Sequence, residues 1–487
     1  MFKKPRAKAG ALIGTILGAV LIATSLAAAA PAAATTYGSV NLLHWVYFGW
    51  QGDHPKSTAM VGGDLSPGNG PIIQYSITTG STTYGPDETE NSGLKSRISW
   101  TLANGYLPSP ISQWPAGTLQ VSVQHFANQI LSGAATAAFT RVTVTNPTGS
   151  AVSTSINIKA LPAVEVPLSG SPTTTDTNSM HYTVSVGAAS SVTRDFVAKA
   201  AGSASATQLA AAGSFDTNYA SMASYWNGRL AATASPASLP DPQLVNMFKA
   251  DQIVEWEGVV NTSDGSGGTN YELRGSGGTP PGAPTDNYDG TYSHDVPDIV
   301  SEMIREGNFS LAKQVLSSSY YLAIAQGPES DYLDGIPKFI EPYWQYLMYT
   351  GDESFFTPAL KTAIENAAHY VSALRDTSGT YNGLMQASNT FDNGSDYLVI
   401  DNMAAINGLQ TYSNLANAWA ASDSSWTAEK TWAISQANSI NSALNARLGT
   451  VMSASGAGYY NACLDSCAWL SSGTYQGNWL GTTLMMS

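Results

Sequence analysis

The chain has 487 residues, of which only 11% are charged, and its formal net charge is −14. This acidic balance excludes a nucleic acid as the expected partner, because phosphate binding requires clustered Lys and Arg, and it also disfavours anionic polymers. A neutral partner fits the composition best, and the length exceeds that of one ordinary domain of roughly 100–200 residues.

The first 34 residues have the pattern of an export signal. The basic start KKPRAK precedes an uncharged stretch, residues 9–26, and the small-residue run AAAAPAAA at residues 27–34. Such a run provides an Ala-x-Ala cleavage site, which we place after Ala34, with Ala30 as the other choice. The alternative is a permanent membrane anchor, because the apolar stretch is close to the roughly 17–25 residues that span a bilayer. We favour cleavage, and therefore a secreted protein without membrane contact.

Residues 35–205 follow the pattern of β-strands. Apolar and polar residues alternate, β-branched residues are frequent, and turns such as NPTG at 146–149 separate the runs. Strands at this spacing, with no helical runs between them, predict an antiparallel β-sandwich with a packing or accessory role. The clearest runs are LQVSVQHF (119–126), FTRVTVTN (139–146), SINIKALPAV (155–164) and HYTVSVGA (181–188).

The apolar period becomes helical from residue 206 onward. Residues 206–240 are predicted to form a helical linker, and residues 241–487 a helical domain. Within it, apolar residues recur at i, i+3, i+4 and i+7, which is typical of amphipathic helices. The predicted helices cover residues 242–260, 296–307, 310–326, 338–351, 354–376, 398–420 and 427–449.

Short and long loops alternate between these helices, an arrangement that predicts αα-hairpins. The long loops at 271–295 and 377–397 are rich in Tyr, Phe, Asp and Gly. Loops longer than about 12–15 residues in compact domains usually carry function or are disordered. The aromatic content favours function, so we expect the site to lie in these two loops.

Cys463 and Cys467 are the two cysteines of the chain. In an exported protein a pair this close is expected to form a disulfide. A metal site is the alternative, but no His lies near in the sequence to complete it. His44, His125 and His369 look isolated, and no HxxxH spacing occurs. We therefore expect no catalytic metal and no cofactor.

Four stretches of the helical region carry a family resemblance. They are LPDPQLVNMFKADQ (239–252), NYDGTYSHDVPDIVSEMIREGNFSLAKQVL (287–316), PYWQYLMYTGDESFF (342–356) and GLMQASNTFDNGSDYLVIDNMAAINGLQTYSNLA (383–416). In this order after a β domain, they resemble the six-hairpin glycosidases, enzymes whose (α/α)6 toroid often follows an N-terminal β-sandwich. The SNTFD string at 388–392 is most similar to the NTYD of the bile-acid β-glucosidase type.

The resemblance implies an α+β multidomain fold, with an N-terminal antiparallel β-sandwich followed by an (α/α)6-type helical toroid. We count about eight helices after residue 207, where a full toroid has twelve. The toroid is therefore expected to be incomplete at the C-terminus.

The resemblance also implies a pair of catalytic carboxyl groups. Glycoside hydrolysis places two of them on opposite sides of the scissile bond, and one must hold a proton near neutral pH. Asp392 takes the place of the catalytic acid, where glucoamylase-like members usually carry Glu. Its alternative is a turn or N-cap aspartate. For a retaining mechanism the second carboxylate is expected to be Glu272, with Glu257 and Glu341 as weaker choices.

Aromatic and polar residues of the same region are expected to bind the sugar. The resemblance implies that Asp295 hydrogen-bonds to sugar hydroxyls. His294 stands where the family usually has Arg. The alternative role for Asp295 is an N-cap of the following helix. Sugar rings stack on aromatic planes, although core packing is the alternative for the two aromatics of the helix at 338–351. The expected substrate-binding residues are Tyr288, Tyr292, His294, Asp295, Tyr343 and Trp344.

These observations predict a secreted glycoside hydrolase that cleaves a neutral oligo- or polysaccharide, its expected partner, by carboxylate acid/base catalysis. The alternative is a non-catalytic extracellular glycan-binding protein on the same scaffold. A polysaccharide lyase is less favoured, because the acidic balance of the chain does not suit uronate substrates.

Overall fold

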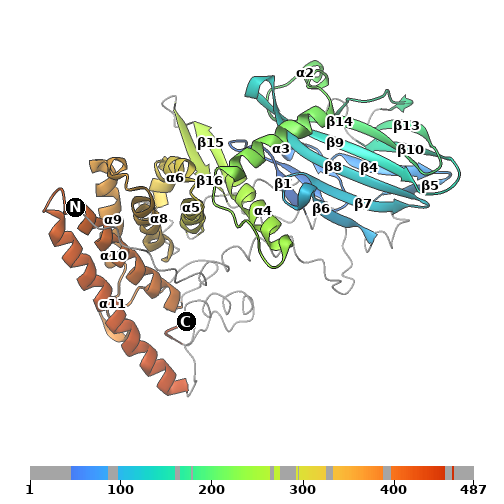
Figure 1. Ribbon diagram of the computed structural model, residues 1–487. Helices are drawn as coiled ribbons and strands as arrows, with labels where there is room; N and C mark the ends of the chain where they lie inside the picture. Colours follow the sequence, from blue (N-terminus) through green and yellow to red (C-terminus); the bar gives the residue numbers. More distant parts are fainter. Residues whose placement is uncertain are drawn as a thin grey trace.

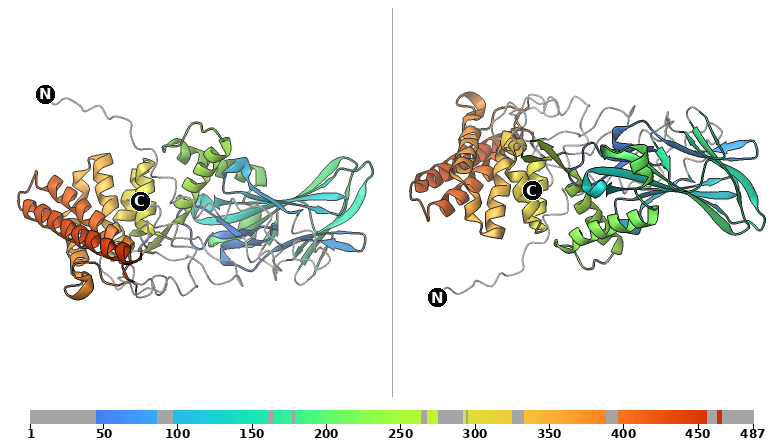
Figure 2. Two further views of the ribbon diagram at one scale, coloured as in Figure 1. Left: turned by 90° about the horizontal axis from the view of Figure 1, so that it is seen from below. Right: turned by 90° about the horizontal axis from the view of Figure 1, so that it is seen from above.

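Antiparallel sheets precede a set of helices in the computed structural model of this chain (Figure 1). Figure 2 shows the sheets at one end of the molecule and the later helices at the other; α3 (Phe215–Ala231) lies over a sheet, and α4 (Pro242–Gly258) follows it in the chain. This order confirms the α+β fold class predicted from the sequence. The described residues are 45–85, 97–159, 165–176, 179–263, 268–274, 292–293, 295–324, 333–387, 396–455 and 463–465.

Two large antiparallel sheets and one small sheet make up the β part. In spatial order, the five-stranded sheet contains β12 (Thr174–Thr175), β13 (Ser179–Val186), β10 (Val152–Lys159), β4 (Gln74–Thr79) and β5 (Thr82–Tyr84). The six-stranded sheet contains β11 (Glu165–Pro167), β14 (Ser190–Gly202), β9 (Ala135–Asn146), β8 (Leu119–Ile130), β7 (Pro110–Ala116) and β6 (Ser99–Leu102). The small sheet contains β1 (Trp45–Phe48), β2 (Ser57–Met60) and β3 (Leu65–Ser66).

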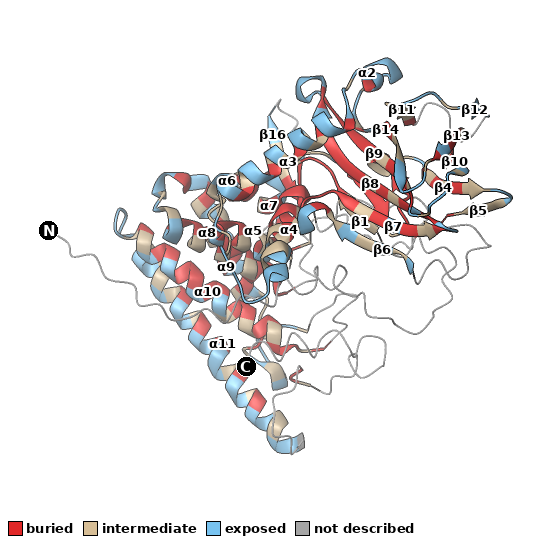
Figure 3. Ribbon diagram, turned by 45° about the vertical axis from the view of Figure 1, so that its right-hand side comes forward, coloured by how far each residue is buried: buried red, intermediate tan, exposed pale blue. Residues whose placement is uncertain are grey.

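The central strands β8 and β9 are buried on both faces. Val123 and Val142 are cross-strand partners, and both are fully buried in the core between the large sheets. Phe126 and Phe139, also partners, stack with a ring-centroid distance of 5.1 Å in the core on the other face. Because successive side chains of a strand point to opposite faces, one pair of strands serves two cores. Figure 3 shows the resulting run of buried residues along β8 and β9.

Helix α3 covers that second face of the sheet. The ring of Phe215, in its first turn, meets Phe126 edge-on with a centroid distance of 4.9 Å. Arg141 of β9 donates to both carboxylate oxygens of Asp195 on β14, at 2.7 and 2.9 Å, and to Asp216 of α3 at 2.7 Å. The arginine therefore fastens the start of the helix to the sheet.

Capping residues fix where the next helices begin. In α2 (Ala206–Ala210), Ser205 and Gln208 form a capping box, and Ser214 caps α3 by accepting from the N–H of Thr217. Asp241 caps α4, whose first residue is a proline that has no N–H to leave unpaired. An antiparallel hairpin, β15 (Val259–Ser263) and β16 (Thr269–Leu273), follows α4 directly.

Most of the helices that follow form antiparallel pairs. The pairs are α5 (Val296–Arg305) with α6 (Phe309–Leu316), α8 (Gly335–Thr350) with α9 (Pro358–Ala373), and α10 (Val399–Trp419) with α11 (Trp426–Ser455); α7 (Ser319–Ile324) follows α6. Residues 306–308, 351–357 and 420–425 link the members of each pair. Gly351 ends α8 with a φ of 66°, a left-handed conformation that favours glycine.

Short 3₁₀ helices complete the described elements. They cover Pro67–Asn69, Ala103–Gly105, Leu131–Gly133, Glu353–Phe355 and Gly379–Tyr381. None of the helices within the described ranges combines the length and the apolar character that a membrane span requires.

One hydrophobic core joins the β part to the helices. It extends from Phe126 and Phe139 of the sheet, through Trp226 of α3 and Trp256 of α4, to Ile440 of α11. The indole rings of Trp226 and Trp256 are nearly parallel, with centroids 6.5 Å apart. The β part and the helices therefore share one interior at their junction.

Candidate active site at the start of helices α5, α8 and α10

The first helices of the three pairs run in the same direction. Lys338, early in α8, lies 3.3 Å from Asp298, early in α5. Further along, Glu341 of α8 accepts from Asn407 of α10 at 3.0 Å and lies 3.8 Å from Arg305 at the end of α5. These contacts align the three helices, so their amino-terminal ends lie at the same end of the bundle.

The segments before these three helices include the two long loops singled out in the sequence. Residues 292–295 precede α5, residues 333–334 precede α8 and residues 396–398 precede α10, whereas the short links lie at the opposite ends of the helices. Because α-helix N-termini carry unpaired N–H groups and partial positive charge, this end also favours acidic side chains and polar ligands. It is therefore our candidate active site.

An ion-paired cluster joins α5 to the start of α8 at this end. Asp334, the residue before α8, lies 3.1 Å from Lys338, which also contacts Asp298 of α5. Burial lowers the pKa of Lys338, but the carboxylates of Asp334 and Asp298 outweigh burial and raise the pKa above its ordinary value. Lys338 therefore remains a cation held between two acidic side chains.

Asp401, in the first turn of α10, lies beneath this cluster. Its exposed fraction is 0%, and neither carboxyl oxygen has a hydrogen-bond partner among the residues that the structure describes. Burial raises the pKa of Asp401 well above its ordinary value, and the charge of Asp334 raises it further. Burial therefore favours the protonated form of Asp401, because an unpaired buried carboxylate would cost several kcal/mol, about the full desolvation penalty.

Ser293 adds a second unpartnered polar group at the same end. Its Oγ is buried next to the start of α8 and has no hydrogen-bond partner within the described ranges of the chain. A Cβ on Gly335 would come within 2.7 Å of that Oγ, so the glycine permits the close approach. Buried polar groups are nearly always paired, and unpaired ones are concentrated at functional or strained sites.

Two of the predicted sugar-binding residues lie at this end. Tyr292 and Asp295 precede α5, and the N–H of Asp295 donates to the carbonyl of Tyr292 at 3.2 Å. Asp295 occupies the N-cap position, but its side chain accepts no capping hydrogen bond. The capping alternative for its carboxylate is therefore not realised.

Tyr343 belongs to the core, which corrects the expectation that it lines an open site. Its exposed fraction is 0%, and its hydroxyl donates to the carbonyl of Leu316 at 2.9 Å. Its ring packs edge-on against Phe339 at 5.2 Å. Trp344, the next residue, is half-buried at the margin of the same core and remains a predicted sugar contact.

The predicted second carboxylate lies in the β15–β16 hairpin. Glu272 has an exposed fraction of 4%, and Arg274 lies 3.2 Å from its carboxylate. The hairpin packs against α6 and α7. Of the weaker choices, Glu257 is buried and accepts from the N–H of Gly49 at 2.8 Å, and Glu341 accepts from Gln345 and Asn407.

Several predicted residues lie outside the described part of the chain. They are Asp392, the expected catalytic acid, together with Tyr288, His294 and Cys467. Cys463 is disulfide-bonded, and the N–H of Leu464 beside it donates to the carbonyl of Tyr397 just before α10 at 2.7 Å.

Asp334, Lys338 and Asp401 were missed by sequence reasoning. Asp334 stands in LDGIPKF immediately before the predicted helix at 338–351, and Asp401 is a lone carboxylate early in an apolar helix. The available signal for the site was an acidic residue at an otherwise apolar position of a helix. Acidic side chains are almost never fully buried unless they are paired.

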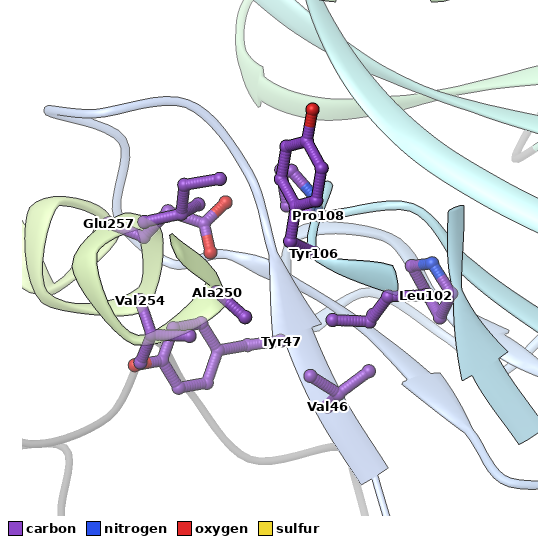
Figure 4. A pocket seen from close by; sticks show the side chains of 10 residues that line it. Val46, Tyr47, Leu102, Tyr106, Pro108, Ala250, Val254 and Glu257 are labelled. Carbon is purple, nitrogen blue, oxygen red and sulfur yellow. The ribbon is translucent and has the colours of Figure 1, made fainter. Parts of the chain in front are cut away.

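A small pocket between α4 and the β part is a separate feature (Figure 4). It has a volume of about 20 Å³ and is lined by Val46, Tyr47, Leu102, Tyr106 and Glu257 among others. That volume holds about one water molecule. Burial raises the pKa of Glu257 there to about 8. The pocket is too small for a sugar ring.

Comparison with known proteins shows a similarity of fold. No family model and no curated protein matches the sequence. A bacterial glucoamylase in complex with acarbose has a similar structure, with a TM-score of 0.52 and 9% sequence identity over 84% of this chain and 68% of that one. The chain therefore partly matches the fold of this glucoamylase, and at this identity the similarity concerns the fold alone.

Two further structures are more distant. A family GH92 α-mannosidase from Bacteroides thetaiotaomicron has a TM-score of 0.29 and 10% identity, covering 77% of this chain and 70% of that one. Another GH92 family glycosyl hydrolase has a TM-score of 0.27 and 13% identity, covering 79% and 50%.

Proposed function

We propose that this chain is a secreted glycoside hydrolase that cleaves glycosidic bonds in a neutral oligo- or polysaccharide. The observation that carries the proposal is the gathering of acidic and polar residues at the aligned amino-terminal ends of α5, α8 and α10. The segments that precede two of these helices belong to the long loops rich in aromatic and acidic residues. The fold shared with a bacterial glucoamylase supports this reading.

Asp392 is the proposed catalytic acid, and Glu272 the proposed second carboxylate. In the sequence, Asp392 stands four residues before Asp396, ahead of α10. An acid that donates its proton to the leaving oxygen requires a raised pKa, which a shielded aromatic setting provides. Tyr292, Asp295 and Trp344 are the proposed sugar contacts among the described residues.

The composition supports a neutral substrate and export. A net charge of −14 repels uronate and other anionic polymers. The basic, apolar and Ala-x-Ala segments at the start of the sequence support secretion. The NTFD string supports a specificity related to the bile-acid β-glucosidase type.

A non-catalytic glycan-binding protein is the second candidate. It is favoured by one observation: the carboxylate of Glu272 is buried and held by Arg274, so in this arrangement it is not open to a sugar. Such a protein would use the same end of the helices to bind a glycan without hydrolysing it.

A sugar-release assay on a panel of neutral glycans distinguishes the two candidates. The wild type is expected to release reducing sugar, and Asp392→Asn to lower kcat/KM by at least ~100-fold, the usual contribution of a general acid. Asp423→Asn, on the exposed link between α10 and α11, is the matched control and should keep full activity. Glycan binding by the wild type without any release would establish the second candidate instead.

A further inference from the structure

The second helices of two neighbouring pairs share a compact group of metal-ligand side chains. Glu365 and His369 lie one turn apart on α9, and Glu429 lies in the first turn of α11. One ligand atom from each of the three lies within 4.8 Å of the others. Residues at i and i+4 share a helix face, so α9 presents two ligands toward the third.

Neighbouring aromatic residues hold two of these side chains in place. The imidazole of His369 stacks on the indole of Trp432 with a centroid distance of 3.8 Å and an interplanar angle of 23°. Its Nε2 lies 2.9 Å from Oε2 of Glu429, and the hydroxyl of Tyr412 donates to the same oxygen at 3.1 Å. Outer contacts of this kind orient the ligands of protein metal sites.

The electrostatics of the group favour a cation. Burial raises the pKa of Glu365, and the negative charge of Glu429 raises it further, while His369 acts in the opposite direction. The side chains of His369 and Glu429 are 45% and 24% exposed. An ion can therefore reach the group from solvent, and water can fill its remaining coordination positions.

We propose that Glu365, His369 and Glu429 bind one divalent transition-metal ion of the zinc type and so join α9 to α11. One imidazole and two carboxylates match the nitrogen and oxygen ligands that zinc accepts, whereas calcium and magnesium prefer oxygen alone. The ion takes the place of the proton between Nε2 and Glu429, and the two carboxylates balance its charge. The site lies apart from the candidate active site and does not depend on the proposed hydrolase activity.

A second group of potential ligands, Asp396, Cys463 and Asp465, does not support a similar proposal. Their ligand atoms also lie within 4.8 Å of one another. Cys463 is disulfide-bonded, however, and metal binding by cysteine requires a free thiolate. The group on α9 and α11 is therefore the better candidate.

Calorimetric titration of ZnCl2 into the purified, untagged and EDTA-treated protein tests the proposal. The wild type is expected to bind one zinc ion per chain, and His369→Ala and Glu429→Gln to weaken that binding by at least ~10-fold. His181→Ala is the matched control, because His181 is also half-exposed and lies 3.4 Å from one carboxylate, that of Asp176. Among the described residues, His181 belongs to no three-ligand group, so this variant should bind as the wild type does.

The thermal midpoint gives a second readout. Zinc should raise the midpoint of the wild type and of His181→Ala, EDTA should reverse the increase, and His369→Ala should not respond. Far-UV circular dichroism establishes that the variants are folded. The proposal is overturned if the wild type binds no zinc, or if folded His369→Ala and Glu429→Gln bind zinc as tightly as the wild type.

Discussion

The carboxylate of Glu257, in the last turn of α4, accepts a hydrogen bond of 2.8 Å from the backbone N–H of Gly49, 208 residues earlier in the chain. Three residues after Gly49, Gly52 donates to the carbonyl of Val259 and accepts from Asn261, each at 3.0 Å. Lys56 is buried beside them and donates to the carbonyl of Trp50 at 2.9 Å. The link between β1 and β2 is thus bound to the start of the β15–β16 hairpin.

Replacing Glu257 with Gln should flatten the pH dependence of stability. Burial raises the pKa of Glu257 to about 8, from 4.5 in an unfolded chain. The stabilisation by this group is therefore complete below about pH 4.5 and is lost as the pH rises through 8. Lys56, whose pKa burial lowers to about 8 from 10.5, is protonated in both states over most of this window and adds little there.

The measurement is the thermal midpoint at pH 5 and at pH 8. The wild type should lose more stability between the two values than Glu257→Gln does, by a few kcal/mol on the scale of ~1.4 kcal/mol per pKa unit. Glu353→Gln, an exposed substitution, serves as the control. Equal changes in all three proteins would contradict the assignment of a buried, protonated Glu257.

Replacing Arg141 should loosen α3 from the sheet. Its guanidinium holds Asp195 and Asp216 together and lies 4.1 Å from the ring centroid of Phe215. Arg141→Ala should lower the free energy of unfolding by about 1–3 kcal/mol in urea, because it leaves the partly buried Asp195 unpaired. Arg141→Lys should recover only part of this loss, since an ammonium cannot reproduce the bidentate contact. Full recovery by lysine would show that charge alone matters at this position.

Replacing Asp401 with Asn should stabilise the protein at pH 8. The pKa of Asp401 is well above its ordinary value, mainly through burial, so the folded state retains a proton that the unfolded chain releases near pH 4. Stability is therefore lost as the pH rises above that value, and a side chain that does not titrate avoids the loss. We expect a gain on the order of 1–3 kcal/mol in urea unfolding at pH 8. Asp298→Asn, at an exposed position, should give no comparable gain, and a less stable Asp401→Asn at pH 8 would refute the prediction.

Replacing Tyr343 with Phe should change stability and leave sugar chemistry unchanged. The substitution removes the hydrogen bond to the carbonyl of Leu316, at a cost of about 0.5–1.5 kcal/mol, and retains the ring in the core. Trp344→Ala, one residue along, should instead raise KM for the glycan that the wild type cleaves. A KM effect in Tyr343→Phe comparable to that in Trp344→Ala would contradict the core placement of the tyrosine.

The sequence pattern predicted the fold class because the period of the apolar residues differs between the two parts. Alternation in 119–126 and 139–146 identified β8 and β9, and the helical period identified α8 to α11 within a few residues. The pattern did not reveal that β8 and β9 continue to Ile130 and start at Ala135, respectively. The end of β8, ANQI, and the start of β9, ATAA, carry little β signal, and pairing between the strands extends them.

The candidate site was predictable only in part. Long loops with Tyr and Asp indicated which end of the helices holds the candidate site, and Tyr292 and Asp295 lie there. The pairing of Asp334 with Lys338, and the burial of Asp401, depend on three helices separated in sequence. Tyr343 could not be assigned to the core from its own position, because an aromatic residue of an amphipathic helix suits either a core or a sugar-binding wall.

The backbone pairing of Gly52 with Val259 and Asn261 limits how this protein can be divided or recombined. A chimaera that kept the helices but took its β part from another protein would also have to supply the stretch from Gly49 to Lys56. Without that stretch, Glu257 would lose its donor, and without the sheet that α3 covers, Trp226 and Trp256 would face solvent. The visible junction of sheet and helix is therefore not a suitable boundary for dividing or recombining this protein.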